Sequence, residues 1–336
     1  MSIIPVEVPT GAIRYNTDSN KMECWIGTKW MEISVSSPDL DGGARATFSG
    51  GQTPSSNYNI IDYITISTAG NAQDFGDLNT SPLGARAAAD RTRGIIAGGY
   101  TPSVINTIEF ITISSTGNAQ DFGDLPSIQS YSGALNNGTR AVFGGTFVPG
   151  GFQNIIQFVT IQSTGSADDF GDLPFTMQVD AAAASPTRGI FFGGYVTAPT
   201  RAVNTIHYIT TATTGNAQDF GDMTIKQYAN AACSNSIRAV SAGGNDYPNK
   251  LSSMEFVTIA TKGNSTSFGS IAATTNYPAA ASSPTRGVIA GGNTPTHLDT
   301  IQYISFATEG DAVDFGDLTQ ARNQLGGLSN ANGGLG

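Results

Sequence analysis

The chain is poor in the residues that most enzymes and metal proteins use. Its 336 residues include only two histidines, His207 and His297, and only two cysteines, Cys24 and Cys233. The cysteines lie 209 positions apart and match neither a disulfide framework nor a zinc-binding spacing. Two histidines also leave few ways to build a zinc site or a His-dependent catalytic triad. We therefore expect a protein that is not an enzyme and that carries no cofactor and no metal.

Charged residues are also scarce, and most of them are acidic. The chain has 26 Asp and Glu against 16 Lys and Arg, a net charge of −10, and only 12% of its residues are charged. The basic residues form no run, whereas a nucleic-acid surface needs clustered Lys and Arg. No apolar run approaches the roughly 18 residues of a membrane span, and residues 1–11 lack the pattern of a secretory signal. We expect neither nucleic-acid binding nor membrane insertion.

An internal repeat organises most of the chain. The tetrapeptide DFGD occurs five times, and SFGS at 267–270 stands where a sixth copy is due. The central phenylalanines are spaced 47, 48, 50, 48 and 47 residues apart, at Phe75, Phe122, Phe170, Phe220, Phe268 and Phe315. Each repeat also has a glycine pair with an arginine four or five residues before it, namely Arg45, Arg93, Arg140, Arg188, Arg238 and Arg286. This period indicates six copies of one structural unit.

Each repeat predicts four short strands. A stretch of small residues, such as 181–185, comes first, and an apolar stretch that ends in the glycine pair, such as 188–194, follows it. The third segment is rich in β-branched and aromatic residues, as at 107–113, and the fourth contains DFGD. Four strands in each repeat of about 45–50 residues are typical of a β-propeller blade, so we expect an all-β fold with six four-stranded blades.

The glycine pair that closes the second strand, with this repeat length, resembles the kelch family of propellers over residues 44–336. The Trp and Tyr that kelch repeats usually carry downstream of the glycines are missing, and the phenylalanine of DFGD is the candidate for their packing role. The first repeat begins directly at its second strand, whereas residues 320–330 follow the last DFGD as a surplus first strand. We expect this C-terminal strand to complete the first blade and close the ring.

Residues 1–35 differ from the repeats and are expected to form a separate β-hairpin-like element, which residues 36–43 link to the propeller at 44–336. Its segment 11–34 predicts three short strands and has too few residues for a core of its own, so we expect it to dock onto a partner or onto the ring. Part of its sequence resembles a short element of bacteriophage tail-fibre and other virion proteins. The residues that carry this resemblance are Arg14, Tyr15, Asn16, Glu23, Gly27 and Trp30.

The repeated DFGD is expected to be structural. Protein kinases use one DFG aspartate, beside a lysine strand and an HRD loop, to bind magnesium, and this chain has no such partners. Because the turns of a blade bring the repeat arginine and DFGD to the same face, we expect Arg–Asp pairs, with calcium at the DFGD turns as the open alternative. The aspartates concerned are Asp74, Asp121, Asp169, Asp219 and Asp314.

Comparison of the repeats shows where binding is expected. The connections between second and third strands, and those between one repeat and the next, vary in length and content, and strand alternation predicts that both sets share one face. Aromatic side chains on rigid loops suit contact with sugars or proteins, although unconstrained loops also drift. The candidate ligand-binding residues are Tyr58, Tyr100, Phe147, Phe152, Tyr195, Tyr228, Tyr247, Tyr277 and His297. His207 is expected to be a surface strand residue.

The resemblance of the N-terminal element implies a virion protein on the surface of a phage particle, assembled in the host cytoplasm, that attaches to other virion proteins through residues 1–35. The first hypothesis is a tail-fibre or spike-type component whose propeller binds a host-surface glycan or protein. A capsid decoration or other structural subunit of the virion is the alternative. A glycan-active enzyme ranks last, because the variable loops offer few acidic residues for paired catalysis. Homo-oligomer formation is left open.

Overall fold

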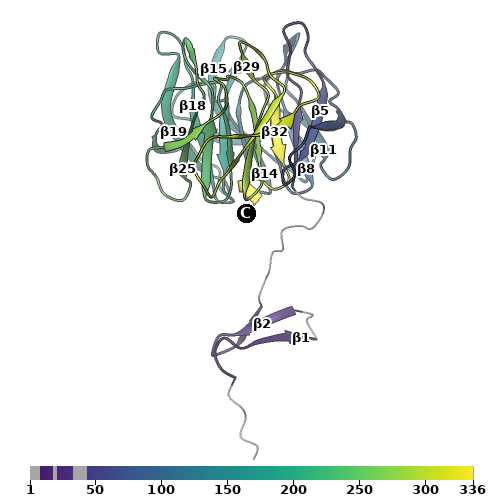
Figure 1. The fold of residues 1–336 in the computed structure, drawn as a ribbon, viewed down its shortest axis with the longest axis vertical. Helices are drawn as coiled ribbons and strands as arrows, with labels where there is room; N and C mark the ends of the chain where they lie inside the picture. Colours follow the sequence, from purple (N-terminus) through teal and green to yellow (C-terminus); the bar gives the residue numbers. More distant parts are fainter. Residues whose placement is uncertain (1–7, 18–20, 33–43, 336) are drawn as a thin grey trace, which may run out of the picture. The chain divides into compact units, whose positions relative to one another are not determined.

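The computed structural model describes residues 8–17, 21–32 and 44–335. The chain divides into two compact units, Met1–Gly42 and Gly43–Gly336. The described residues consist of strands, turns and one 3-10 helix, η1 (Gly333–Leu335), so the expectation of an all-β fold is confirmed (Figure 1). Among these residues, no helix has the length and apolar character needed to cross a membrane.

The described part of the N-terminal unit is one antiparallel sheet. Its strands are β1 (Ile13–Asn16), β2 (Lys21–Trp25) and β3 (Trp30–Glu32), paired in the order β1-β2-β3. They lie where the sequence predicted three short strands. The predicted linker, 36–43, lies outside the described residues.

The described residues of the larger unit contain six four-stranded antiparallel sheets, numbered sheet 1 to sheet 6 in the chain order of their second strands. The first strands, in the order of the sheets, are β33 (Gly326–Ser329), β7 (Arg86–Ala89), β13 (Gly133–Asn136), β17 (Ala181–Ala184), β21 (Ala231–Ser234) and β27 (Ala279–Ser282). The second strands are β4 (Arg45–Ser49), β8 (Arg93–Ala97), β14 (Arg140–Val148), β18 (Arg188–Tyr195), β22 (Arg238–Ala242) and β28 (Arg286–Ala290).

The third and fourth strands complete each sheet. The third strands are β5 (Ile60–Thr65), β11 (Thr107–Thr112), β15 (Gly151–Thr160), β19 (Ala202–Thr210), β25 (Ser253–Thr258) and β31 (Thr300–Ser305). The fourth strands are β6 (Gln73–Asp77), β12 (Gln120–Asp124), β16 (Asp168–Asp172), β20 (Gln218–Asp222), β26 (Thr266–Ser270) and β32 (Val313–Asp317). Three small hairpins lie between second and third strands: β9–β10 (Tyr100–Thr101, Ser103–Val104), β23–β24 (Asn245–Asp246, Asn249–Lys250) and β29–β30 (Asn293–Thr294, Thr296–His297).

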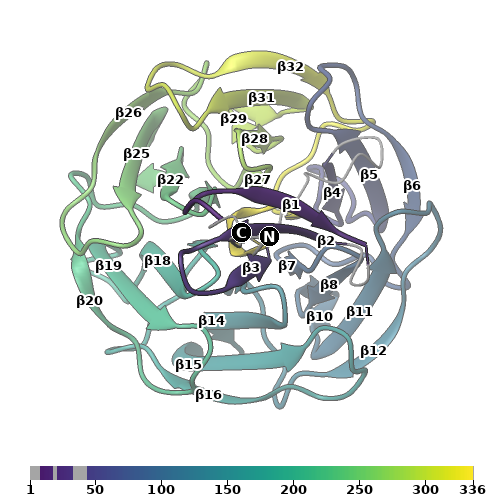
Figure 2. The same cartoon turned by 90° about the horizontal axis from the view of Figure 1, so that it is seen from below.

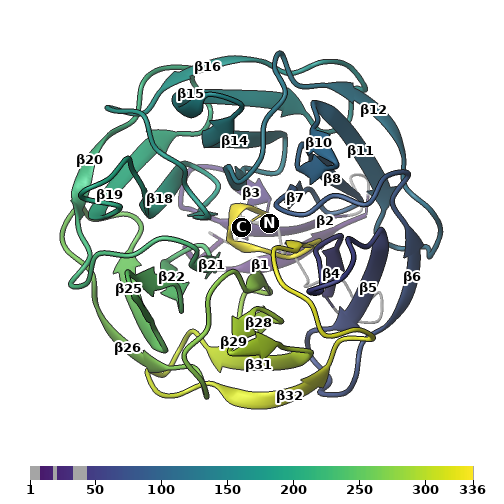
Figure 3. The ribbon, with the colours of Figure 1, turned by 90° about the horizontal axis from the view of Figure 1, so that it is seen from above.

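The six sheets are arranged around a common centre, with the small-residue first strands nearest to it and the fourth strands at the periphery (Figure 3). The last described element, η1, lies near the middle of this arrangement, where it contacts the first strands β13, β17 and β21 (Figure 2). In sheet 1 the first strand comes from the end of the chain, because β33 pairs with β4, Gly326 opposite Ser49 and Ser329 opposite Ala46. Residues 320–330 therefore supply the strand that the sequence predicted. The arrangement is consistent with a β-propeller.

The apolar core lies between neighbouring sheets. Each hydrophobic cluster combines residues of two sheets, so that Phe75 of sheet 1 packs with Ile96 of sheet 2, and Phe315 of sheet 6 packs with Ile66 of sheet 1. The DFGD phenylalanines enter these clusters because each lies at a β-bulge: Ile61 pairs with Gly76 and Asp62 with Asp74, which leaves Phe75 as the extra residue. All six phenylalanines are at most 3% exposed. The packing role expected of this phenylalanine is confirmed.

The repeat arginines join neighbouring sheets, but they do not pair with the DFGD aspartates as expected. Each guanidinium lies 4.4–4.7 Å from the centre of an aromatic ring on its own third strand. It also donates to a backbone carbonyl just after the third strand of the next sheet. For the arginines in chain order, Arg45 to Arg286, the accepting carbonyls belong to Ile113, Ile161, Ala212, Ile259, Phe306 and Ser67. The expected Arg–Asp pairs are wrong because these carbonyls and rings engage the guanidinium instead.

The DFGD backbone makes a second set of contacts between sheets. The carbonyl of Phe75 accepts a 2.7 Å hydrogen bond from the amide of Gly117, in the turn before the fourth strand of sheet 2, and the same bond recurs at every junction. Gly76 has φ +144°, and a Cβ at this position would lie 2.5 Å from the Gly117 carbonyl oxygen, so only glycine fits. Asp74 and its four counterparts are exposed. SFGS retains the phenylalanine and the glycine and loses only the acids, which explains why it can replace DFGD.

Candidate functional site

The candidate binding residues lie on one face of the larger unit, which we call the loop face. It is formed by the connections between second and third strands and by those that lead from one sheet to the next (Figure 3). Isolated β-bridges join the two sets of connections in all six sheets, such as Ser130 with Phe147 and Gln178 with Tyr195. The expectation that the two variable sets share one face is confirmed.

Four of the candidate aromatic residues form a continuous row across sheets 3, 4 and 5. The ring centroids of Phe147 and Phe152 lie 5.9 Å apart, those of Phe152 and Tyr195 lie 5.3 Å apart, and those of Tyr195 and Tyr228 lie 4.8 Å apart. All four side chains are half-buried. We call Phe147, Phe152, Tyr195 and Tyr228 the aromatic row.

The length of the strands in sheets 3 and 4 brings this row together. β14 and β15 continue past the glycine pair, and their register places Phe147 opposite Phe152. β18 likewise continues to Tyr195, which bridges to the connection that precedes sheet 4. Edge-to-face and tilted contacts hold the rings and leave part of each exposed.

The other candidate residues are dispersed over the face. Tyr100 is 41% exposed at the start of β9, and Tyr58 is half-buried in the connection of sheet 1. Tyr247 is 56% exposed, and the guanidinium of Arg201 lies 4.1 Å from its ring centre. His297 is half-buried in β30, where burial lowers the pKa of its imidazole.

The equivalent positions in sheets 5, 6 and 1 are polar. Asn245 pairs with Lys250 in the hairpin of sheet 5, and Asn293 pairs with His297 in the hairpin of sheet 6. The Lys250 ammonium donates to the Asn293 carbonyl at 2.9 Å, which ties the two hairpins together. The loop face is therefore divided into an aromatic part over sheets 3 to 5 and an amide-rich part over sheets 5, 6 and 1.

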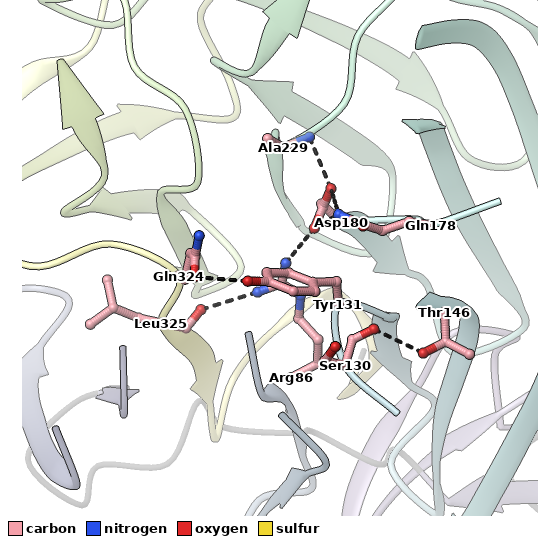
Figure 4. Close-up of polar contacts among 9 residues, drawn as sticks. All are labelled: Arg86, Ser130, Tyr131, Thr146, Gln178, Asp180, Ala229, Gln324 and Leu325. Carbon is pink, nitrogen blue, oxygen red and sulfur yellow. Dashed lines mark hydrogen bonds and ion pairs between the residues drawn. The ribbon is translucent and has the colours of Figure 1, made fainter. Parts of the chain in front are cut away.

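A buried ion pair lies near the centre of the loop face (Figure 4). Arg86 Nη2 lies 2.6 Å from Asp180 Oδ1, and the two side chains are 10% and 1% exposed. Asp180 also accepts hydrogen bonds from Gln178 Nε2 at 3.0 Å and from the Ala229 amide at 2.9 Å. Arg86 and Asp180 belong to sheets 2 and 4, so the pair connects two sheets that are not neighbours.

Two tyrosine rings in contact lie beside this ion pair. The ring centroid of Tyr131 lies 5.8 Å from the Arg86 guanidinium carbon and 5.9 Å from the ring centroid of Tyr277. Tyr277, one of the candidate binding residues, is half-buried here. The Tyr131 hydroxyl donates to Gln324 Oε1 at 2.9 Å. Burial raises the pKa of both tyrosines well above its ordinary range, so both remain protonated donors.

Backbone hydrogen bonds support the same cluster. Four residues that precede first strands have φ between +52° and +60°: Tyr131, Ala229, Tyr277 and Gln324. Ala229 donates its amide to Asp180, Tyr277 to Ala229, and Gln324 to Tyr277. Four non-glycine residues in the left-handed region are unusual, and this series of bonds stabilises them. At sheet 4 the Asp180 carboxylate takes the place of a backbone carbonyl in the series.

Below the ion pair, the space between the first strands is too small for a ligand. Two cavities of about 40 and 60 Å³ lie there, lined mainly by alanines such as Ala87, Ala182 and Ala280. Because a single water needs roughly 10–15 Å³ of such space, each cavity holds only a few waters. Cys233 lines the larger cavity, and burial raises the pKa of its thiol to about 12.

His207 is buried, and its expected surface position is wrong. It is 3% exposed, its ring meets that of Phe175 edge-to-face with the centroids 5.6 Å apart, and burial lowers the pKa of its imidazole. The residues at this third-strand position in sheets 1, 2, 5 and 6 accept a hydrogen bond from a backbone amide in the connection before their sheet, as Glu109 does from Asn79 at 3.1 Å. Sheets 3 and 4 have Pro126 and Pro174 at the position of that amide. Because proline has no amide hydrogen, an acidic side chain at the third-strand position would receive no such hydrogen bond there.

The described residues contain no group of three or more His, Cys, Asp or Glu that could hold a metal ion. Sequence reasoning missed Arg86, Tyr131 and Asp180. The available signal was that Arg86 stands where the other first strands begin with Gly or Ala.

Neither the comparison with models of known protein families nor that with curated proteins gave a match.

Proposed function

We propose that residues 44–336 form a six-bladed, kelch-like β-propeller closed by β33, and that its loop face binds a host-surface ligand. We further propose that the chain is a bacteriophage virion protein of the tail-fibre or spike type. The six sheets, the pairing of β33 with β4, and the arginine contact from Arg286 back to the carbonyl of Ser67 support the closed ring. The sequence of residues 11–34 supports attachment to other virion proteins.

The aromatic row carries the binding proposal. Its four rings form a partly exposed apolar surface held by long strands, so that little side-chain entropy is lost when a ligand packs on it. The adjoining amides of Asn245 and Asn293 can exchange hydrogen bonds with the hydroxyls of a glycan or the backbone of a protein. The small alanine-lined cavities offer no comparable site for a reaction, so we propose a binding protein and not an enzyme.

Binding should be measured with the full chain against host-surface glycans and with a variant that shortens the row, Tyr195→Ala with Tyr228→Ala. We expect at least a tenfold loss of affinity, because two stacking rings are removed. Ile237→Ala is the control, since Ile237 is a 61% exposed apolar residue in the turn between β21 and β22, outside the loop face. Equal binding by both variants would overturn the proposed site.

Immunogold labelling of phage particles that carry the chain tests its place on the virion. Label on the tail fibres or tail tip is expected. Label over the head would favour the decoration subunit instead, and particles without label would overturn both virion assignments.

A further inference from the structure

The connections of the loop face carry few charges, and their basic groups lie together. They hold seven Asp, Glu, Lys and Arg residues, of which Asp180 and Arg322 belong to buried ion pairs. The five others are Arg201, Lys226, Asp246, Lys250 and Asp299. All three basic residues of this set lie in the hairpin connections of sheets 4 and 5 or between those sheets, together with one acid, Asp246. The aromatic row ends at Tyr228, in the same part of the face.

The backbone holds Arg201 next to the aromatic row. Arg201 precedes Ala202, which the register places opposite Tyr195 of the row. Its carbonyl accepts a hydrogen bond from the Val196 amide at 2.8 Å, and the Ala202 amide donates to the Thr200 carbonyl at 2.7 Å. Arg201 has φ +58°, a left-handed conformation that glycine adopts at less cost. This turn therefore fixes the base of a long cationic side chain beside the row.

The guanidinium of Arg201 reaches sheet 5 with its donors unused. It lies 4.1 Å from the ring centre of Tyr247, which is 56% exposed. Within the described residues the guanidinium forms no ion pair and donates no hydrogen bond, so its five N–H groups are available to a ligand. Burial raises the pKa of the Tyr228 hydroxyl, and the charge of Arg201 acts against this shift. The guanidinium is thus within electrostatic reach of the end of the row.

The other two basic groups are placed differently. Lys250 already donates to the Asn293 carbonyl and ties two hairpins together. Lys226 is fully exposed, two residues before Tyr228, and no ring or turn holds its side chain. Arg201 is the basic group that combines a fixed backbone, a ring contact and open donors.

We propose that the ligand of the loop face is an acidic glycan, whose acid group pairs with Arg201 while a neighbouring sugar ring packs on Tyr195 and Tyr228. This inference rests on the proposed function, because it takes the aromatic row as the binding surface. A guanidinium presents a planar fork that matches two oxygens of a carboxylate or a phosphate with parallel hydrogen bonds. A neutral glycan would use the row and leave this fork without an acceptor.

Chemical removal of the acid groups tests the class of ligand. The probe is the polysaccharide fraction extracted from the surface of the host bacterium, digested with proteinase and immobilised. One portion is treated with carbodiimide and borohydride, which reduces carboxylates to alcohols, and another with cold hydrofluoric acid, which cleaves phosphate esters. We expect one of the two treatments to weaken binding of the full chain at least tenfold, and the effective treatment identifies the acid group.

Matched variants test the role of Arg201. Arg201→Gln removes the charge on the loop face. Lys262→Gln is the control, because Lys262 Nζ also lies over a tyrosine ring, 4.7 Å from the centre of Tyr208, but in the exposed turn between β25 and β26, outside the loop face. We expect Arg201→Gln to bind the untreated fraction at least tenfold more weakly and the acid-free fraction as the unmutated chain does. Arg201→Lys should recover part of the loss, and Lys262→Gln should bind normally.

The outcomes separate this inference from the proposed function. If both treatments leave binding unchanged, or if Arg201→Gln binds the untreated fraction as the unmutated chain does, the acidic glycan is excluded. The row remains the site in that case, provided that Tyr195→Ala with Tyr228→Ala still loses binding. If neither this variant nor Arg201→Gln changes binding, both proposals are overturned. Host material that binds only before digestion with proteinase would identify a protein ligand and would also exclude the glycan.

Discussion

Arg322 offers the sharpest test of how sheet 1 is completed. Its side chain is fully buried, and it lies in the segment that leads to β33. The guanidinium is 2.8 Å from Asp62 Oδ2 and donates to the carbonyls of Gly50 and Ile60 at 3.0 Å each. Burial lowers the pKa of Arg322, and the charge and hydrogen bond of Asp62 oppose that shift.

Arg322→Gln removes one partner of this buried pair and leaves the Asp62 carboxylate with only the amide and hydroxyl of Thr319. Breaking a buried pair in this way typically costs about 3–5 kcal/mol of unfolding free energy. At about 2 °C per kcal/mol for a large domain, we expect the melting temperature of the larger unit to fall by roughly 6–10 °C. Circular dichroism is the suitable assay for this change. Tryptophan fluorescence would report on the other unit, because both tryptophans lie there.

The chain supplies the matched control. At the junction of sheets 2 and 3 the equivalent positions are Gln129 and Gln157, an uncharged pair 3.5 Å apart. Arg322→Gln combined with Asp62→Gln copies that junction, and we expect it to recover most of the loss, to within about 1–2 kcal/mol of the unmutated chain. If Arg322→Gln alone lowers stability by less than 1 kcal/mol, or if the double variant is no better than the single one, the reasoning is wrong.

Three further predictions concern the repeats. Gly123→Ala should destabilise the larger unit by about 1–3 kcal/mol more than Gly117→Ala. Both glycines have φ near +150°, but only at Gly123 would the Cβ meet a backbone oxygen at 2.5 Å. Equal losses of stability in urea unfolding would show that the close contact contributes nothing and that the backbone conformation alone causes the loss. Asp169→Ser should change the unfolding free energy by less than about 0.5 kcal/mol, since Asp169 is exposed. A larger loss in the same assay would contradict the conclusion that the DFGD aspartates do not stabilise the fold. His207 has a folded pKa below its unfolded value, so stability should decline as pH falls below about 6.5, by at most about 1.4 kcal/mol per pH unit. In His207→Gln that decline should be smaller, and identical pH profiles would exclude the assignment.

Much of the fold follows from residues that recur. The third strands were predictable because β-branched and aromatic residues cluster in them, and the first strands because they are rich in alanine and glycine. The surplus at 320–330 predicted the pairing of β33 with β4, since a repeat that starts late must be completed from elsewhere. These inferences needed only the repeat period and strand propensity.

The side-chain partners were harder to predict. The arginine and DFGD of one repeat approach the same face, and opposite charges suggested a pair. The acceptor that the guanidinium finds is a carbonyl of the next sheet, which no side-chain pattern records. The error at His207 is different, because its cause was visible in the sequence. Pro174 stands in the connection before sheet 4 where Asn79, before sheet 2, donates its backbone amide to Glu109, and proline has no amide hydrogen to donate.

The contacts between sheets also explain why the loop face is free to vary. The arginine and DFGD contacts end on backbone carbonyls and amides, so they impose no side chain on the connections of the loop face. A charged residue that departs from the repeat must therefore have a local reason. Arg86 and Asp180 replace residues that are small or uncharged in the other sheets, and they join sheets 2 and 4. Arg322 departs in the same way, and it holds the end of the chain on sheet 1. In a repeated fold of this kind, the positions that break the repeat are thus the first ones to test for a specific contact.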